Sequence, residues 1–226
     1  MSEAIKPSVG LGVLHLFCKP TPMFDGESVV AAVRAAEAAG TQVACISMLG
    51  HKSDAAFMAI HENLVELRAL QSGLQRAGLE VVDSYVSLTE VSEYGAGMPE
   101  AHIQARLYPE IPPKAHHMPA WCFYPMSKKR EAHVNWFTLP FDDRKRLMSE
   151  HGTSGRKFAG RIVQYITGST GLDDYEWGVT LFAVHPDDLK EVVYTMRFDE
   201  ASSVYAEFGP FYTGFVVPVD ELVTTL

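Results

Sequence analysis

The segment Trp121-Cys122-Phe123-Tyr124-Pro125-Met126-Ser127-Lys128 begins the stretch around which the rest of the chain is organised, and this stretch continues to Trp177. Successive side chains of a strand point to opposite faces, so Tyr124, Met126 and Lys128 share one face and Trp121 and Phe123 lie on the other. Further along come a histidine, a glutamine and several arginines among large apolar residues. Such a mixture is typical of a ligand pocket, and we expect this stretch to supply one.

The elements around this segment occur in the same order twice. Apolar periodicity, glycine stops and proline starts predict them. In the first part of the chain we expect strands over residues 10–19, 41–49, 54–60 and 79–89, and helices over 27–39 and 62–77. In the second part we expect strands over residues 119–126, 160–167, 176–184 and 211–217, and helices over 140–150 and 186–197.

Each half therefore reads β-α-β-β-α-β, which is the ferredoxin-like arrangement. Helices cover one face of each such sheet, so the other two faces must be buried, most simply against each other as a barrel-like pair. We predict an α+β fold in which two ferredoxin-like halves form a dimeric α+β barrel within one protomer. Residues 1–92 form the N-terminal half and residues 119–226 the C-terminal half.

The two halves are joined by a proline-rich connection over residues 93–118. Its prolines, together with the one that directly follows it, exclude regular structure through most of its length: Pro99, Pro109, Pro112, Pro113 and Pro119. Connections of this length more often have a function than not.

Composition excludes several classes of protein. The chain has 226 residues, 47% of them apolar and 21% charged, which is ordinary for a globular protein. A net charge of −9 argues against general nucleic-acid binding. Cys18, Cys45 and Cys122 have no metal-ligand spacing, so we interpret them as reduced core thiols of a cytoplasmic protein. No apolar run is long enough for a membrane span, and the N-terminus has no signal-peptide core.

Several ordered motifs in the C-terminal half resemble those of the chlorite dismutase-like haem proteins. They are Tyr124-Pro125-Met126-Ser127-Lys128, His151-Gly152 with Gly155-Arg156, Gly168-Ser169 through Glu176-Trp177-Gly178, Met196-Arg197-Phe198-Asp199-Glu200, and Glu207-Phe208-Gly209. Within that superfamily the chain is similar to the coproheme decarboxylases, which make haem b in the last step of a haem synthesis pathway. The N-terminal half matches only in the order of its elements. The resemblance implies a homopentamer with the porphyrin bound by the C-terminal half and no cofactor in residues 1–92.

His151 is the candidate iron ligand. Taken alone, a histidine just before a helix-ending glycine is more often a favourable partner of the helix dipole. The resemblance reverses this interpretation, because the histidine of the His-Gly motif is the proximal ligand of the family. The other ring nitrogen of such a ligand is normally held by an acceptor, which the sequence does not identify.

Tyr124 and Lys128 are the candidate catalytic residues. An isolated tyrosine on a strand is most often a core residue with its hydroxyl tied to backbone. In the family, however, the tyrosine of this motif is the redox-active residue that abstracts hydrogen from a propionate. The resemblance assigns Lys128 a propionate contact or proton-donor role, whereas the ordinary alternative is a solvated loop lysine. Met126 is expected to form the pocket wall.

Gln164 separates two branches of the superfamily. It lies between isoleucines on one strand face, where an amide must find partners or cost a few kcal/mol. The ordinary interpretation is an amide bonded to backbone, and the resemblance implies a distal residue that points at the iron. Chlorite dismutases place an arginine here to hold an oxyanion, so glutamine favours the decarboxylases. Trp177, in the Glu176-Trp177-Gly178 motif, is a further expected porphyrin contact.

The charge pattern supports an anionic ligand. Between residues 128 and 161 nine lysines and arginines stand against four acids, a local net charge of about +5. Arg144, Lys145 and Arg146 are more simply an exposed basic helix face. Arg156 and, in the connection, Arg106 match motif arginines of the family and are the expected propionate contacts, with Ser202 as a weaker polar contact.

His116 and His117 are the remaining candidates. One of them could serve as the distal base for peroxide, and solvated loop histidines are an equally good interpretation.

We therefore predict a hydrogen-peroxide-dependent coproheme decarboxylase. Its substrate and redox centre is iron coproporphyrin III (coproheme), two propionates of which become vinyl groups to give haem b. A chlorite dismutase or peroxidase of the same fold, and a non-enzymatic haem-binding or haem-transfer protein, are the alternatives. Transient contact with the ferrochelatase of the pathway is a further expectation.

Overall fold

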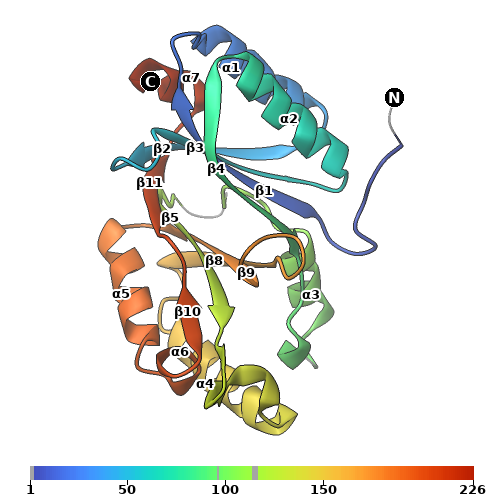
Figure 1. Ribbon diagram of the computed structural model, residues 1–226, viewed down its shortest axis with the longest axis vertical. Coiled ribbons are helices and arrows are strands. Elements are labelled where there is room, and N and C mark those ends of the chain that lie inside the picture. Colours follow the sequence, from blue (N-terminus) through green and yellow to red (C-terminus); the bar gives the residue numbers. More distant parts are fainter. Residues whose placement is uncertain (1–2, 96, 114–116) are drawn as a thin grey trace.

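The computed structural model describes residues 3–95, 97–113 and 117–226 (Figure 1). His116 lies outside the described residues. The first half contains all six predicted elements within two residues of their expected ends. They are β1 Gly12–Pro20, α1 Gly26–Ala38, β2 Gln42–Leu49, β3 Ala55–His61, α2 Leu64–Arg76 and β4 Leu79–Thr89.

The second half also contains its six predicted elements. They are β5 Ala120–Lys128, α4 Phe141–Arg156, β8 Ile162–Gly168, β9 Trp177–Ala183, α5 Pro186–Met196 and β11 Tyr212–Val216. Short elements that the sequence analysis did not predict are β6 Arg130–Glu131, β7 Val134–Asn135, α6 Glu200–Ser203, β10 Ala206–Phe208 and α7 Val219–Leu222.

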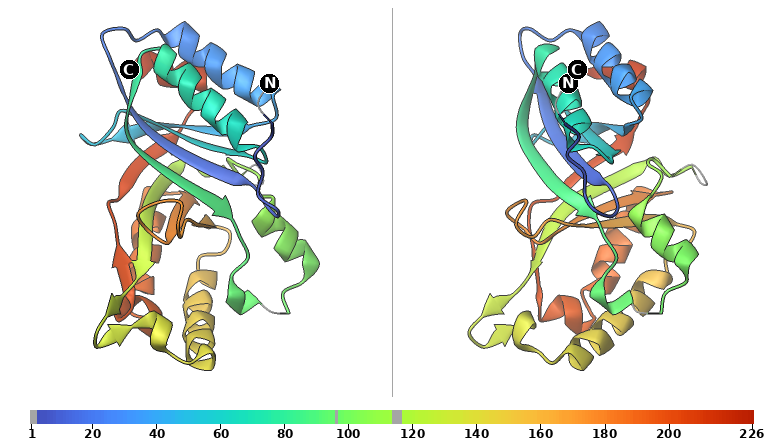
Figure 2. Two further views of the ribbon diagram at one scale, coloured as in Figure 1. Left: turned by 45° about the vertical axis from the view of Figure 1, so that its right-hand side comes forward. Right: turned by 90° about the vertical axis from the view of Figure 1, so that its right-hand side faces the viewer.

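Strand pairing confirms the predicted fold class. The strands follow the order β10-β5-β11-β2-β3-β1-β4-β8-β9, and an additional pairing of β5 with β9 closes the sheet into a barrel. Within each half the order is ferredoxin-like: β4-β1-β3-β2 in the first half and β8-β9-β5-β11 in the second. The halves join through antiparallel pairs at both seams, β11 with β2 and β4 with β8. The result is one continuous barrel (Figure 2).

Apolar side chains from both halves fill the barrel. Trp121 and Phe123 of β5 pack there with Phe17 of β1, Met58 of β3 and Phe182 of β9. Outside the barrel a second core lies between the first-half strands and helices α1 and α2, and a third lies between the second-half strands and α5. Cys18, Cys45 and Cys122 are buried and unpaired, as predicted for core thiols. Within the described ranges no helix is long and apolar enough to cross a membrane.

Helix α2 shows how the sequence fixes one of the covering helices. Asn63 caps its first turn by accepting a hydrogen bond from the backbone N–H of Val65. Leu67, Leu70 and Leu74 form its apolar stripe and are buried against the sheet. After the helix Gly78 has φ +83°, a left-handed conformation, and a side chain at this position would collide with the backbone of Met23.

The sequence analysis did not predict one helix and placed the end of another wrongly. Helix α3, Glu100–Leu107, forms inside the proline-rich connection, because its eight residues contain no proline and Pro99 stands just before its first turn. Helix α4 does not end at Gly152 but runs on to Arg156. Gly152 is not among the glycines with positive φ, whereas Gly160 beyond the helix is, with φ +82°. A glycine stops a helix only where it adopts the left-handed conformation.

Candidate functional site

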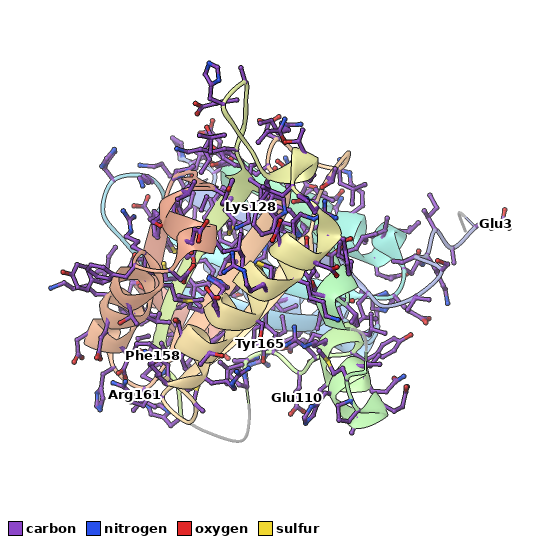
Figure 3. All side chains as sticks on the ribbon, turned by 90° about the horizontal axis from the view of Figure 1, so that it is seen from below. Glu3, Glu110, Lys128, Phe158, Arg161 and Tyr165 are labelled. Carbon is purple, nitrogen blue, oxygen red and sulfur yellow. The ribbon has the colours of Figure 1, made fainter. Side chains whose placement is uncertain are left out.

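A cavity of about 430 Å³ lies between the sheet of the second half and helix α4, and we call it the α4 cavity. Helix α4 contacts α5 and α6 rather than resting on the strands, so it forms a roof over the sheet (Figure 2). Figure 3 looks onto this roof from below. The α4 cavity is lined by Tyr124, Met126 and Lys128 of β5, Gln164 and Ile166 of β8, Trp177 and Val179 of β9, His151 of α4, and Ser202 of α6.

Strand register sets the positions of the residues on the cavity floor. Tyr124 lies opposite Val179, which lies opposite Ile166 on the next strand. One step along the strands, Met126 lies opposite Trp177, which lies opposite Gly168. Paired residues share a face, and residues two apart on a strand return to it. The predicted parity of Tyr124, Met126 and Lys128 is therefore confirmed, and this face is the floor of the cavity.

Tyr124 is held rigidly with its hydroxyl unbound. The side chain is 5% exposed, and its ring stacks on Phe211 at 4.5 Å between centroids. Among the described residues no hydrogen-bond partner of its hydroxyl is found, so the ordinary interpretation of a tyrosine tied to backbone does not hold. Burial raises the pKa of Tyr124 above its usual value, so the phenol keeps its proton. The site holds a neutral phenol with a free hydroxyl at the edge of an apolar cavity.

His151 is oriented by a carboxylate that the sequence analysis did not identify. Its Nδ1 lies 3.0 Å from Oδ2 of Asp199 and 3.3 Å from Oγ of Ser202. The other oxygen of Asp199 accepts a hydrogen bond from the backbone N–H of Ser202 at 2.9 Å, which fixes the carboxylate. With the proton on Nδ1, as this acceptor favours, Nε2 has a free lone pair.

The protonation state of His151 suits metal ligation. Burial lowers its pKa from 6.5, and Asp199 opposes this shift without cancelling it. A neutral imidazole that lines an apolar cavity and is oriented by a carboxylate fits the axial ligand of an iron porphyrin. The helix-dipole interpretation is wrong, since His151 lies five residues before the end of α4 and not at its C-terminus.

Lys128 is buried, which excludes the solvated loop lysine. Its side chain ends β5 at 6% exposure, and its Nζ donates a 2.6 Å hydrogen bond to the backbone oxygen of Ala201. The same Nζ lies 4.4 Å from the ring centroid of Trp136. Burial lowers the pKa of Lys128 to about 8, against the opposing effect of Asp199 and Glu176. The ammonium therefore has unused donor capacity beside the cavity.

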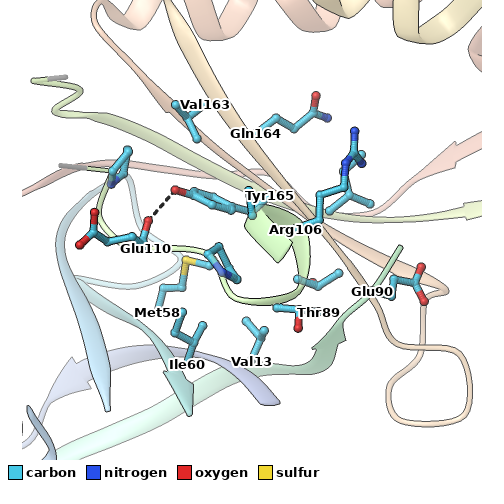
Figure 4. Close-up of a pocket in the computed structure, with 15 residues that line it drawn as sticks. Val13, Met58, Ile60, Thr89, Glu90, Arg106, Glu110, Val163, Gln164 and Tyr165 are labelled. Atoms are coloured by element: carbon cyan, nitrogen blue, oxygen red, sulfur yellow. Dashed lines mark hydrogen bonds between the residues drawn. The ribbon is translucent and has the colours of Figure 1, made fainter. Parts of the chain in front are cut away.

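Gln164 and Arg106 stand between the α4 cavity and a neighbouring one. This second cavity, the α3 cavity, has about 450 Å³ and shares Glu90, Arg106, Gln164 and Ile166 with the first. In Figure 4 the side chains of Gln164 and Arg106 point the same way, away from the apolar wall of Val13 and Ile60. Helix α3 thus brings Arg106 to the site, as the resemblance implied. Gln164 has no hydrogen-bond partner within the described chain, so the amide is not tied to backbone.

Trp177 has a partner that the sequence analysis also missed. Its Nε1 donates a 3.0 Å hydrogen bond to Oε1 of Glu90, the residue that follows β4 of the first half. Glu90 comes from the range predicted to form the half without cofactor, yet it lines both cavities. No sequence signal distinguishes this glutamate from other surface acids, because only the β4–β8 pairing brings it to the floor.

Three predicted contacts lie away from the cavities or outside the described residues. Arg156 is exposed at the end of α4, donates a hydrogen bond to Oγ1 of Thr153 at 2.6 Å, and lines neither cavity. His117 is exposed and likewise lines neither cavity. His116 is not described. Propionate contact by Arg156 and a base role for these histidines remain predictions.

The basic helix face was only partly predicted. Arg146 is exposed and pairs with Glu150 one turn on. Arg144, in contrast, is largely buried: its Nε donates to the hydroxyl of Tyr94 at 3.0 Å, and its Nη1 donates to the backbone oxygen of Leu139 at 3.1 Å. Its side chain is 17% exposed, so the expectation of an exposed arginine was wrong. The residue anchors the start of α4 to the 93–95 segment.

Comparison with known proteins gives close relatives of the whole arrangement. Coproheme decarboxylase of Staphylococcus carnosus is 43% identical over 193 residues, which cover 80% of this chain and 75% of that protein. The structure of a heme-binding protein from Thermus thermophilus superposes with a TM-score of 0.84 at 31% identity and covers 98% of both chains. A mutant chlorite dismutase from Candidatus Nitrospira defluvii shares the fold, with a TM-score of 0.76 at 20% identity over 96% of both chains.

The extent of these matches decides the family. The model of the chlorite dismutase family matches residues 25–217, which span parts of both ferredoxin-like halves and include every element that lines the α4 cavity. The fold, the cavity and the relatives agree, and this chain belongs to the chlorite dismutase family.

Proposed function

We propose that this protein is a coproheme decarboxylase, which converts iron coproporphyrin III to haem b by oxidative decarboxylation of two propionates with hydrogen peroxide. One observation carries the proposal: a single apolar cavity contains both an imidazole suited to iron and a buried phenol with a free hydroxyl. The relative from Staphylococcus carnosus bears this name, at 43% identity. When bound, the iron porphyrin supplies the peroxide-activating metal and the propionates that react.

His151 and Asp199 would orient the porphyrin. Asp199 keeps the proton on Nδ1, so Nε2 offers its lone pair to the iron from the roof of the cavity. The carboxylate also makes the imidazole a stronger electron donor. Ser202 fixes the carboxylate by its backbone N–H, so the ligand geometry is set by α6 as well as by α4.

Tyr124 would carry the hydrogen-abstraction step from the floor. Its hydroxyl keeps the hydrogen atom until the residue is oxidised, because burial disfavours the phenolate. After oxidation the phenoxyl oxygen would remove a hydrogen atom from the propionate carbon next to the ring. The substrate radical would then pass one electron to the peroxide-oxidised porphyrin and lose carbon dioxide, which would leave a vinyl group. The stacked ring of Phe211 and the tilted ring of Phe208 hold the phenol in place for this step.

Cationic side chains would hold the propionates. Lys128 and Arg106 line the α4 cavity, and each can form a charge-assisted hydrogen bond to a carboxylate. Arg156 would make a peripheral contact from the end of α4.

Gln164 argues against the chlorite dismutase alternative. A neutral amide supplies donors and an acceptor toward the iron but no fixed positive charge with which to hold an oxyanion. The Thermus thermophilus relative is described as a heme-binding protein, which keeps a non-enzymatic carrier as the second candidate. The homopentamer and the ferrochelatase contact, both implied by the resemblance, are part of the proposal as well.

The absorption spectrum and the porphyrin mass after mixing the protein with iron coproporphyrin III and hydrogen peroxide test the proposal. We expect two successive losses of a formic-acid equivalent and the spectrum of haem b. Unchanged porphyrin would contradict the proposal in favour of the carrier, and oxygen release from chlorite would favour the other enzyme. Tyr124→Phe, which keeps the cavity shape, serves as the matched inactive control.

A further inference from the structure

Two tryptophans line the α4 cavity in opposite electrostatic environments. Trp136 has the ammonium of Lys128 4.4 Å from its ring centroid. Trp177 instead donates its Nε1 proton to the carboxylate of Glu90 at 3.0 Å. Both indoles are therefore within reach of any oxidant formed in the cavity, but their neighbours carry charges of opposite sign.

These neighbours change how easily each indole loses an electron. One-electron oxidation makes the ring positive and its N–H strongly acidic. A cation over the ring opposes that charge by Coulomb repulsion, which is strong where water is excluded. A carboxylate bonded to the N–H stabilises the charge and can take the proton. Trp136 is thus protected from oxidation, and Trp177 is poised for it.

The position of Glu90 is built into the fold. Its carboxylate lies over Gly168, the residue paired with Trp177, and any side chain at position 168 would collide with it. Burial raises the pKa of Glu90, while the bond from Trp177 lowers it. The carboxylate is consequently a better proton acceptor than a glutamate fully surrounded by water.

Trp177 is also close to Tyr124. Met126 pairs with Trp177, and Tyr124, two residues earlier on the same strand, pairs with Val179. Tyr124 and Trp177 are therefore diagonal neighbours on one face of an antiparallel pair, a separation of roughly 7–8 Å. The two oxidisable residues are thus neighbours on the cavity floor.

We propose that Trp177 and Glu90 form a second one-electron redox site of the cavity, next to Tyr124. Trp177 gives one electron to the peroxide-oxidised porphyrin, and its Nε1 proton moves to the Glu90 carboxylate. The products are a neutral indolyl radical and a neutral carboxylic acid, and return of the electron and the proton restores both groups. The oxidant comes from the proposed function, on which this inference rests.

Oxygen incorporation at each tryptophan, measured by peptide mass spectrometry, tests the pair. We treat the Tyr124→Phe complex with coproheme and peroxide, and expect oxidation at Trp177 to exceed that at Trp136. Adding Glu90→Gln keeps an acceptor for the N–H but removes the base. Oxidation of Trp177 should then fall roughly 5-fold or more, because a charge-assisted hydrogen bond is about twice as strong as a neutral one. Unchanged oxidation of Trp177 in the Glu90→Gln background would overturn the inference.

Lys128→Met is the reciprocal variant. Lys128 is also a proposed propionate contact, so this variant is oxidised without porphyrin, by azidyl radicals. It removes the cation over Trp136, so oxidation of Trp136 should rise while that of Trp177 stays the same. Equal labelling of Trp136 with and without the ammonium would contradict the assigned charge effect.

The ligand-free protein separates this inference from the proposed function. Azidyl radicals oxidise indoles by one electron without any porphyrin, and the same decrease at Trp177 is expected in Glu90→Gln. If this decrease occurs but coproheme is not decarboxylated, the proposed function alone fails. If decarboxylation proceeds and Trp177 is insensitive to Glu90, the second redox site alone fails.

Discussion

The two halves share one order of elements but differ in packing. The first is closed, because its helices pack directly on the sheet, and the second is hollow, because a cavity separates α4 from the sheet. In the first half α1 buries Val29, Val33 and Ala36 against the sheet. The corresponding helix of the second half, α4, buries only Leu147, and the space beneath it is the α4 cavity. A helix without a wide apolar stripe gains little by closing on a sheet. The same topology therefore gives a solid support in one half and a ligand site in the other.

The sharpest test of this comparison is Tyr124→Phe in the hollow half. We expect turnover to fall below about one thousandth of the original rate, a barrier increase of roughly 4 kcal/mol, because phenylalanine has no hydrogen atom to give. Thermal midpoint and coproheme affinity should be retained, since the ring still stacks on Phe211. Haem b yield, coproheme affinity and thermal midpoint, all measured on this one variant, distinguish a redox role of Tyr124 from a structural one. Near-normal yield from a well-folded variant would remove Tyr124 from the mechanism.

His151→Ala should have the next largest effect. Loss of the His151 imidazole should weaken coproheme binding by more than about 100-fold. Removal of a residue that only supports a metal-binding side chain typically costs at most about 100-fold. Asp199→Asn, which keeps the shape but not the charge, should lie within that range of roughly 10–100-fold. Titration monitored by absorption measures both. If His151→Ala keeps the affinity and the imidazole spectrum, another residue binds the iron.

Truncation of an apolar side chain should affect different properties in the two halves. Leu70 is 2% exposed in the closed half, so Leu70→Ala should cost about 2–5 kcal/mol of unfolding free energy and leave coproheme affinity unchanged. Ile166 is 42% exposed on the cavity floor, so Ile166→Ala should cost much less stability but weaken binding. Denaturant unfolding and coproheme titration of both variants check this. Similar stability losses would mean that the second half is packed as tightly as the first.

The cationic residues of the second half should make the protein prefer coproheme to haem b. Lys128→Ala should weaken coproheme binding more than haem b binding, by about 10-fold or more if the contact is desolvated, because coproheme has two additional carboxylates. Arg156→Ala should show a smaller difference, since Arg156 is exposed and outside the cavity. Equal losses for the two porphyrins would indicate a structural role for Lys128.

The smallest expected effect is a pH dependence of coproheme affinity. The pKa of Lys128 is lowered to about 8 by burial, with Asp199 and Glu176 acting in the opposite direction. The ammonium is charged below this pH and must be reprotonated on binding above it. Affinity should therefore fall as pH rises above about 8, by at most 10-fold per pH unit. Lys128→Arg should show a flat profile, and a fall of the same size in that variant would assign the dependence to another group.

Much of the fold was predictable because it depends on local periodicity. The six elements of each half, their types and the face of Tyr124 follow from apolar spacing along single strands and helices. Fewer features of the site were predictable. Asp199 was visible only as part of a motif, with nothing to pair it with His151 across 48 residues. Glu90 carried no signal at all, since its contact with Trp177 spans 87 residues.

Four features follow from the amino-acid sequence alone: the α+β class, the two ferredoxin-like halves, the shared face of Tyr124, Met126 and Lys128, and the family resemblance. Three others become visible only in the folded chain: α4 stands off the sheet, Asp199 holds His151, and Glu90 of the first half reaches Trp177 of the second. The difference lies in the sequence separation over which each feature is set. A periodic pattern records which side of an element is buried, whereas the partner across a cavity is set by strand pairing and helix packing between distant segments.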